Sequence, residues 1–496
     1  MNKRLFHCVT AALLGLALAA LLLLLGTSVP ARAGSNVHCV NQTGTGCDAI
    51  CGGGCYTSVQ AAVDAASPSH EIRIAAGIYT DPAGTVAAIA KELAMRGSYG
   101  QPCGDSDFDP DMHQTVLDAQ WSGSVVSITN AGDVMLQHLT FTHGDGKGNC
   151  GPWAGCGGGV YVKDTAIHIG QCVITDNVGS SAQSAFGGGI YVGNSNLGAP
   201  ANIWETRFVS NTASTASVGW GGGLYLEAGT SISSAVVTGN TFEGNIASTA
   251  SSGDGQGGGM YMMQYGVLSN NLFRQNRAGR DTSGTGGGLY MWEVWGATLK
   301  ANRFLNNVAS EGSSYGTGGA IYCGVSVVVT MSNNLLAGNT ASSKGDGLCL
   351  STFSGEHIAA TLVNNTLADN TAGAGSEGIW VGSYISLTLI NNLIAGHTVG
   401  VTNTVPASST VTADHNLFWN SSDPITGSNA IHADPLLIAD YHLGIGSPAE
   451  DAGVTIPWLT DDLAGDSRPQ GSGYDMGAYE GTRSEVFLPL VMRNYQ

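Results

Sequence analysis

The stretch FLNNVASEGSSYGTGGAIY, at positions 304–322, decides the fold because it joins two short patterns that recur along the chain. The first pattern is Phe-x-x-Asn, here Phe304 to Asn307, and the second is Gly-Gly-Ala-Ile, here Gly318 to Ile321. Copies of the second pattern are GGGVY (157–161), GGGIY (187–191), GGGLY (221–225 and 286–290) and GGGMY (257–261), with weaker copies GDGLC (345–349) and SEGIW (376–380). A phrase that returns at a steady interval indicates a repeat architecture.

The asparagine that ends the first pattern sets the interval. It recurs every 31 to 34 residues, at Asn177, Asn211, Asn245, Asn276, Asn307, Asn339 and Asn370. Apolar residues within each copy alternate or form short runs, which is typical of β-strands, and glycine interrupts any helical period. With about three short strands per copy and no helix between them, the sequence predicts an all-β fold, a single-stranded right-handed parallel β-helix over residues 71–433.

Each repeated residue then has an expected structural role. Asparagines at the same corner of successive coils should hydrogen-bond to one another in a ladder along the axis. Glycine permits a positive φ at the opposite bend, and the Phe, Leu or Ile of the first pattern should point inward. Roughly eleven coils at about 4.8 Å each predict a rod about 50 Å long.

The N-terminal part predicts export. Lys3 and Arg4 precede an apolar run from Val9 to Leu25, and ARA at 31–33 offers small residues for cleavage, so residues 1–33 are interpreted as a secretory signal peptide. The alternative is a retained single-span anchor, because the run approaches spanning length. With the signal removed we expect no stable transmembrane anchor, and a protein that is secreted or held at the cell surface.

Both ends of the rod are expected to be closed. Residues 34–70 form a Cys-rich segment and a helical cap, since SVQAAVDAA (58–66) places Val59, Ala62, Val63 and Ala66 on one helical face. Residues 434–481 break the repeat and should close the far end. The tail, residues 482–496, contains VFLPLVMRNYQ, which is either a last edge strand or a sorting signal.

Composition excludes several classes of protein. The formal net charge is −19, and the signal carries three of the 18 basic residues, so nucleic acid is not an expected partner. The 73 glycines show no three-residue period, which excludes collagen. Only 11% of residues are charged, so solubility must come from Ser, Thr, Asn and the main chain.

The cysteines of an exported chain predict disulfides. Ten remain after the signal, at Cys39, Cys47, Cys51, Cys55, Cys103, Cys150, Cys156, Cys172, Cys323 and Cys349. The alternative for the first four is a zinc site, although their spacing is not the usual C-x2-C. The pairing does not follow from the sequence.

Two family resemblances follow from these patterns. GGAIY with FLNN, and the related copies over 157–380, resemble the repeat of the polymorphic outer membrane proteins, which are β-helical surface proteins implicated in adhesion. The chain departs from that family towards its C-terminus, so the family's export route is not carried over. The resemblance implies a β-helix exposed at a cell surface.

The C-terminal part carries the second resemblance. DYHLGIGSPAEDAG (440–453) followed by DLAGDSRPQGSGYDMGAYE (462–480) resembles the choice-of-anchor Q segment, which follows pectate-lyase-like β-helices in secreted bacterial proteins. YTSVQAAVDAA with IRIAAGIYTD is similar to the opening of the same group. The resemblance implies attachment to the cell envelope through the C-terminus.

One region has the composition of a sugar-binding site. Its basic residues are Arg274, Arg277, Arg280, Lys300 and Arg303. They are accompanied by Trp292, Glu293 and Trp295, with Tyr290 and Asp281 in the same stretch. Cations beside aromatic platforms suit an acidic sugar, because Arg pairs with carboxylate or sulfate and Trp stacks on the ring. The alternative is that the tryptophans pack on neighbouring coils and the cations balance an acidic rod.

An acidic loop and a fringe of loops complete the candidates. GDSDFDPDMH (104–113) carries Asp105, Asp107, Asp109 and Asp111, a weak Ca²⁺ candidate that lacks the EF-hand glycine and closing glutamate. No other cofactor is expected. Loops rich in Ser, Ala, Thr and Gly follow each ladder asparagine and should form a lateral fringe that includes Trp220 and Tyr315.

Two functions remain open. A non-catalytic, adhesin-like β-helix that binds polysaccharide or cell-surface glycans is favoured, because no lyase or hydrolase signature is recognisable in the repeats. The alternative is a polysaccharide lyase or glycoside hydrolase, which fold analogy alone supports. Titratable residues side by side on adjacent coils would favour the enzyme.

Overall fold

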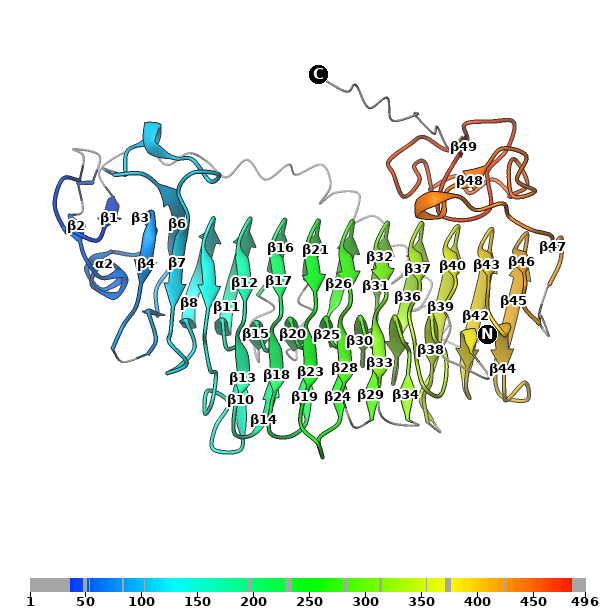
Figure 1. The fold of residues 1–496 in the computed structure, drawn as a ribbon, viewed down its shortest axis with the longest axis horizontal. Coiled ribbons are helices and arrows are strands. Elements are labelled where there is room, and N and C mark those ends of the chain that lie inside the picture. Colours follow the sequence, from blue (N-terminus) through cyan, green and yellow to red (C-terminus); the bar gives the residue numbers. More distant parts are fainter. Residues whose placement is uncertain are drawn as a thin grey trace, which may run out of the picture.

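The computed structural model describes residues 36–483 apart from 48–50, 53, 83, 102, 194–198, 228–233, 281–282, 312–314, 354, 371–375, 423–424 and 426. The predicted signal peptide and residues 484–496 of the tail therefore lie outside the described residues. Figure 1 shows parallel strands stacked as a straight rod of about eleven turns, which confirms the predicted parallel β-helix. Within the described residues no helix is both long and apolar enough to cross a membrane.

One coil illustrates the architecture. It runs through β19 (Gly219–Trp220), β20 (Leu224–Glu227), β21 (Ser234–Thr238), β22 (Thr241–Glu243) and β23 (Ile246–Ser248). β20 and β21 belong to a 23-stranded main sheet, β22 to a 13-stranded sheet that we call the flank sheet, and β23 and β19 to sheets of five and six strands. The next coil repeats this order in β24 (Gly255–Gln256), β25 (Met260–Met262), β26 (Tyr265–Ser269), β27 (Leu272–Arg274) and β28 (Arg277–Gly279).

Equivalent residues of successive coils stack on one another. Leu224 pairs with Met260 and Leu226 with Met262 inside the core. The phenylalanines of the first pattern stack in the same way, with ring centroids 4.5 to 4.6 Å apart from Phe208 through Phe242 and Phe273 to Phe304. All are fully buried, so their predicted inward orientation is confirmed.

The predicted asparagine ladder is also confirmed. Asn177, Asn211, Asn245, Asn276, Asn307, Asn339 and Asn370 are all fully buried. From Asn177 to Asn339, each Nδ2 donates to Oδ1 of the asparagine one coil later, at 2.8 to 3.0 Å. The same amide donates to a main-chain carbonyl of the preceding coil, as Asn245 does to Phe208. The ladder satisfies main-chain groups where the strand bends.

A second ladder runs along the other edge of the flank sheet. It comprises Asn240, Asn271, Asn302, Asn334, Asn365, Asn392 and Asn416, joined side chain to side chain at 2.9 to 3.0 Å. These residues had no expected role, although several open the same NxFxxN motifs. An asparagine ladder therefore frames the flank strands at both ends.

Glycine is required at the bend before each tyrosine. Gly221 has φ +66°, in the left-handed region. A Cβ at its neighbour Gly222 would lie 2.3 Å from the carbonyl oxygen of Gly258 in the next coil. The GGG pattern is therefore architectural, as predicted.

The N-terminal cap is α2 (Val59–Ala65), the only α-helix of the described residues. Ser58 caps its N-terminus by accepting a hydrogen bond from the Ala61 amide, and Val59, Ala62 and Val63 are buried as predicted. At its other end the Lys91 ammonium donates to the carbonyls of three residues, Val63 (2.9 Å), Asp64 (3.3 Å) and Ala66 (2.7 Å). These bonds satisfy carbonyls that a helix C-terminus leaves unpaired.

The C-terminal segment, residues 434–481, does not close the far end of the rod, which corrects the expectation from sequence. It lies along the flank sheet of the last coils (Figure 1). Leu463, Ala478 and Tyr479 pack against Ala301, Leu335 and Ala337, and Leu443, Ala449 and Met476 pack against Leu393, Ala395 and Leu417. The reason is that β37 (Leu335–Ala337), β43 (Leu393–Ala395) and β46 (Leu417–Trp419) carry apolar residues on their outer face.

Outer asparagines bind this segment to the rod. The side-chain amides of Asn333, Asn364 and Asn391 donate to the carbonyls of Asp461 (2.5 Å), Asp475 (2.7 Å) and Val454 (2.8 Å). In the motifs SNN, VNN and INN, the second asparagine belongs to the second ladder, whereas the first donates a hydrogen bond to the C-terminal segment.

A buried ion pair forms the interior of the segment. The side chains of Arg468 and Glu480 are fully buried and in contact. Arg468 Nη2 also donates to Asn333 Oδ1 at 3.1 Å and to the Gly477 carbonyl at 2.9 Å. The guanidinium thus connects two parts of the C-terminal segment and also connects the segment to the rod.

Candidate functional site

The predicted cluster of cations and tryptophans is not one site. In this fold, thirty consecutive residues pass once around the coil, so residues close in sequence lie on different faces. A side chain instead meets its equivalents about one repeat away, as the registers of the flank sheet show. The stretch from Arg274 to Arg303 is therefore distributed over four faces of the rod.

Four of the five cations have separate partners. On the flank sheet, Arg274 forms an ion pair with Glu243 of the preceding coil. Arg277 of β28 pairs with Glu311. Lys300, which ends β31 (Ala297–Lys300), lies 2.7 Å from Asp461 of the C-terminal segment, and Arg303 of β32 (Arg303–Leu305) donates to the Tyr479 hydroxyl at 3.5 Å. Arg280 is exposed at the start of a fringe loop, and Asp281 lies outside the described residues.

The two tryptophans and Glu293 belong to one bend, between the main-sheet strands β30 (Leu289–Met291) and β31 of a coil. Trp292 is half-buried, Glu293 is exposed at φ +53°, and Trp295 is 57% exposed. The ring of Trp292 lies 6.2 Å from that of Phe353, which is 59% exposed and comes from two coils further on. We call Trp292, Trp295 and Phe353 the aromatic corner. Phe353 was not predicted, because its coil has lost the GGG pattern.

A row of tyrosines leads to this corner along the outer face of the main sheet. The rings of Tyr161, Tyr191, Tyr225, Tyr261, Tyr290 and Tyr322 stack at centroid distances of 4.7 to 5.6 Å. The first five are 3 to 8% exposed, because neighbouring rings and Phe186, Trp220 and Trp292 cover them. Burial raises the pKa of Tyr225 well above its ordinary value. These tyrosines are structural, whereas Trp292 and Phe353 bring the row to the surface.

The predicted fringe residues differ in exposure. Trp220 is half-buried, stacks on Phe186 at 4.5 Å and donates to Gln256 at 3.1 Å. Tyr315 is 71% exposed. Trp153, which sequence analysis did not single out, is 85% exposed in the loop closed by the Cys150–Cys156 disulfide.

Titratable residues side by side on adjacent coils would favour an enzyme, and one pair of carboxyl groups meets this criterion only in part. Asp346 and Glu377 take the place of the middle glycine in GDGLC and SEGIW. Burial raises the pKa of both, that of Asp346 to about 7, with Glu377 as a further cause for Asp346. Asp346 is 1% exposed and accepts from the Ala341 amide at 2.5 Å, so a substrate does not reach it. Beside them, the Lys344 ammonium lies 4.4 Å from the Trp380 ring centroid.

Three of the four aspartates in the acidic loop have protein partners for their carboxylates. Asp105 lies 2.7 Å from the guanidinium of Arg73. Asp107 accepts from the Gly104 amide at 3.0 Å, and Asp109 accepts from the amides of Asp111 and Met112 at 3.0 and 3.1 Å. The last two bonds form a turn typical of aspartate. Calcium binding at these residues stays a prediction.

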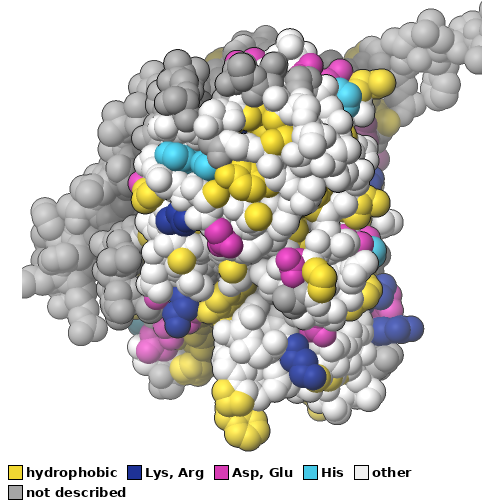
Figure 2. All heavy atoms as spheres, turned by 90° about the vertical axis from the view of Figure 1, so that its left-hand side faces the viewer, with side chains coloured by type: hydrophobic (Ala, Val, Ile, Leu, Met, Phe, Trp, Pro, Cys, Tyr) yellow, Lys and Arg dark blue, Asp and Glu magenta, His cyan; other side chains and the backbone are white. Residues whose placement is uncertain are grey.

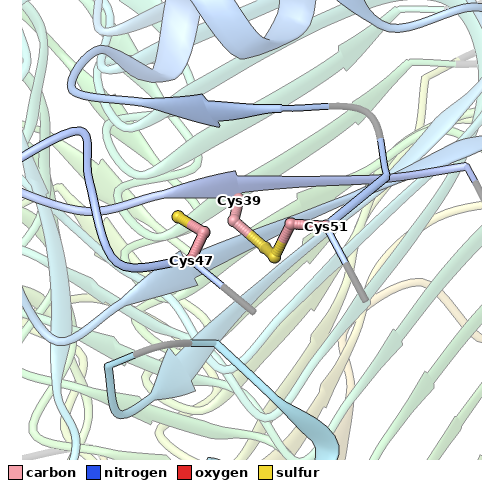
Figure 3. Close-up of side chains that lie close together, drawn as sticks. All are labelled: Cys39, Cys47 and Cys51. Atoms are coloured by element: carbon pink, nitrogen blue, oxygen red, sulfur yellow. A yellow bond between two sulfur atoms is a disulfide. The ribbon is translucent and has the colours of Figure 1, made fainter. Parts of the chain in front are cut away.

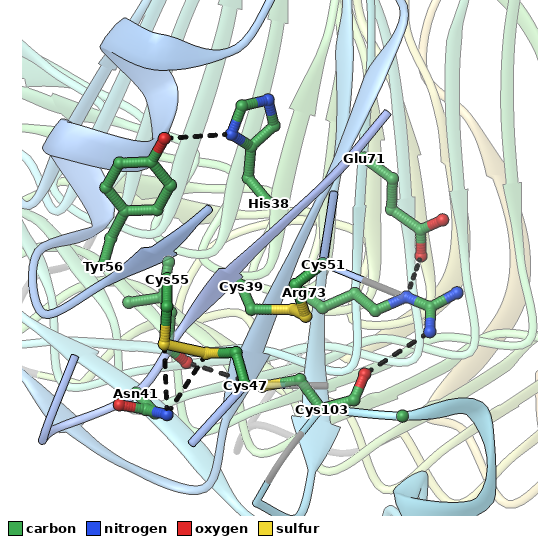
Figure 4. The surroundings of a disulfide bond; sticks show 12 residues. His38, Cys39, Asn41, Cys47, Cys51, Cys55, Tyr56, Glu71, Arg73 and Cys103 are labelled. Atoms are coloured by element: carbon green, nitrogen blue, oxygen red, sulfur yellow. Dashed lines mark hydrogen bonds and ion pairs between the residues drawn. A yellow bond between two sulfur atoms is a disulfide. The ribbon is translucent and has the colours of Figure 1, made fainter. Parts of the chain in front are cut away.

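The N-terminal cysteines form disulfides. Cys39 pairs with Cys51 and Cys47 with Cys55 (Figure 4). Three of the sulfur atoms lie within 4.8 Å of one another (Figure 3), but zinc binds thiolates, and paired cysteines offer none. Cys103, Cys172, Cys323 and Cys349 are free and buried. Six of the ten cysteines thus form the predicted disulfides.

Charged side chains are sparse on the end of the rod that carries α2. Figure 2 shows this face with basic and acidic groups interspersed and most of the surface uncharged. This agrees with a charged fraction of 11% in the whole chain.

The chain was compared with known proteins. Neither family models nor curated proteins match its sequence. Among solved structures it is similar to the crystal structure of pectate lyase Pel9A, at 13% sequence identity and a TM-score of 0.41, over 91% of this chain and 97% of that chain. The assignment to the parallel β-helix fold rests on the strand pairing described above.

Proposed function

We propose that the chain is a secreted or cell-surface β-helix that binds polysaccharide or cell-surface glycans without cleaving them. The observation that carries the proposal is the aromatic corner, where the ring centroids of Trp292 and Phe353, from different coils, lie 6.2 Å apart, and the exposed Trp295 follows Trp292 by three residues in the same bend. Flat apolar rings at a solvent-facing surface suit the apolar faces of sugar rings.

The ligand of the corner is a neutral chain rather than an acidic one. The cations predicted to accompany the tryptophans are engaged with Glu243, Glu311 and Asp461 on other faces. Glu293, which does lie at the corner, repels a uronate. The resemblances to polymorphic outer membrane proteins and to choice-of-anchor Q segments support a location at the cell surface, and an adhesin-like role agrees with it.

The test combines binding with cleavage. The mature protein is titrated against neutral and uronic-acid polysaccharides, with and without Ca²⁺, while new reducing ends are measured. We expect binding of neutral chains, no cleavage, and about tenfold weaker binding after Trp295→Ala or Phe353→Ala, since a lost ring contact is worth about 1.4 kcal/mol. Trp153→Ala, a more exposed tryptophan on another face, is the matched control.

Two outcomes decide against the proposal. Release of reducing ends would assign the chain to the polysaccharide lyases or glycoside hydrolases. Unchanged binding in both corner variants would move the glycan site elsewhere.

A further inference from the structure

A cavity of about 480 Å³ lies between the C-terminal segment and the flank sheet of the last coils. Its polar and aromatic lining comprises Asp369, Trp419, Asn420, Asp434, Asp440 and Tyr441. The volume falls within the range of small-molecule sites, which is about 300 to 1,000 Å³. The aromatic corner does not contribute to it.

Small residues beside a large one create the floor of the cavity. On the outer face of the flank sheet, Ala368, Ala395 and Trp419 occupy the same register position in successive coils. The two alanines leave space next to the indole, and Trp419 remains 41% exposed although its neighbours are covered. A Cβ at Gly396 would lie 2.4 Å from Asp369 Oδ1, so glycine makes room for that carboxylate.

The charge of the cavity is entirely negative among the described residues that line it. Asp369 comes from the rod, whereas Asp434 and Asp440 come from the C-terminal segment, and no lysine or arginine lines the cavity with them. Tyr441 donates a hydrogen bond to Asp369, and burial together with this carboxylate raises the pKa of the tyrosine. The hydroxyl therefore stays protonated and orients one of the three acids.

We propose that this cavity binds a cationic amino sugar, a hexosamine with a free ammonium group. Three carboxylates attract the ammonium, the Trp419 ring offers a face to the sugar, and Asn420 supplies a donor and an acceptor for hydroxyls. The aromatic surface and the volume select an organic cation over a metal ion. This site is independent of the neutral-glycan site at the aromatic corner.

Calorimetry with the whole mature protein tests the proposal. Glucosamine, N-acetylglucosamine and glucose share a ring and differ in charge, so they separate the ammonium from the sugar. We expect glucosamine to bind at least tenfold more tightly than the two neutral sugars, and its binding to weaken as NaCl is raised.

Variants locate the binding. Trp419→Ala and Asp440→Asn should each weaken glucosamine binding about tenfold or more, whereas Phe353→Ala, at the aromatic corner, should leave it unchanged. Asp434→Asn serves as a second acid variant if Asp440→Asn unfolds the segment, which circular dichroism monitors. Three results would each overturn the proposal. N-acetylglucosamine could bind as tightly as glucosamine, or Trp419→Ala could leave the affinity for glucosamine unchanged. The protein could also give a binding heat with CaCl₂ but none with glucosamine.

Discussion

The middle coils and the last coils share an interior but differ on the flank. The second ladder and an inward Phe, Leu or Ile in each flank strand run through both, whereas the ladder that begins at Asn177 ends at Asn370. On the outer face of the flank sheet the middle coils carry the polar residues Thr241, Glu243 and Arg274 beside Leu272, whereas the last coils carry the apolar Leu335 and Leu393. The interior residues thus specify the coil, and the outward residues specify what covers it.

The largest effect is expected from Arg468→Ala. Removing the guanidinium leaves the fully buried Glu480 without its partner, which costs about 3–5 kcal/mol. We expect residues 434–481 to lose protection from hydrogen exchange, while residues 219–279 in the middle coils keep theirs. Arg274→Ala, which breaks an exposed pair, should cost under about 1 kcal/mol. Equal loss of protection in both regions would show that the rod depends on its C-terminal segment.

Asn276→Ala affects the middle coils instead. It leaves the main-chain carbonyl of Phe242 and the side-chain oxygen Oδ1 of Asn307 with fewer donors in a buried ladder, at a cost of about 1–3 kcal/mol. Asn333→Ala, which removes an outer asparagine, should destabilise only the C-terminal segment. Urea denaturation followed by hydrogen exchange distinguishes the two, with Ser251→Ala in an exposed loop as the control. If both variants affect the same region, the division between inner and outer asparagines is wrong.

Asp346 marks the boundary between the two regions and predicts a pH dependence. Because burial raises its pKa to about 7, the native state binds a proton more tightly than the unfolded state. Stability should therefore fall as pH rises from about 4 to about 7. Asp346→Asn keeps an acceptor for the Ala341 amide and removes the charge, so it should stabilise the protein by about 1–3 kcal/mol at pH 8. Melting temperatures between pH 4 and 8 test this, and parallel profiles for the two proteins would contradict it.

The smallest effect is expected in the reactivity of the four free thiols towards a thiol reagent. Cys349 takes a tyrosine position in the outer row, yet it is fully buried, as is Cys323. Burial raises the pKa of Cys172 to about 12 and of Cys103 to about 11, which keeps these thiols protonated and unreactive. We expect the native mature protein not to react with a thiol reagent, and four thiols to react after unfolding. Rapid reaction of even one thiol in the native state would place that cysteine at the surface.

The sequence was informative where contacts follow the repeat. In a parallel β-helix, Asn245 meets Asn276 and Phe242 meets Phe273, so the period itself predicts the contact. The same geometry explains why Arg274 and Trp292 were wrongly grouped, since half a repeat separates opposite faces. The cavity was not predictable, because it depends on the path of residues 434–441, including positive φ at Asp440 and Tyr441.

The position of the C-terminal segment had a signal that sequence analysis did not use. Leu335 takes the register position of Arg303 and Leu393 that of Thr366, and doubled asparagines recur at 333–334, 364–365 and 391–392. An earlier pair, Asn270 and Asn271, precedes the covered coils, so the doubled motif predicts the segment only together with the apolar outward residues.

The docked segment also sets an order of folding. Contacts within the rod join residues about one coil apart, whereas Lys300 bonds to Asp461 and Asn333 to Arg468 across 161 and 135 positions. A chain synthesised from its N-terminus can add coil upon coil to the α2 cap, because each closure is local. The apolar flank of the last coils stays open to water until residues 461–480 arrive. The C-terminal segment thus shields an apolar flank of the rod from water, and we expect a chain cut before residue 434 to aggregate through that flank.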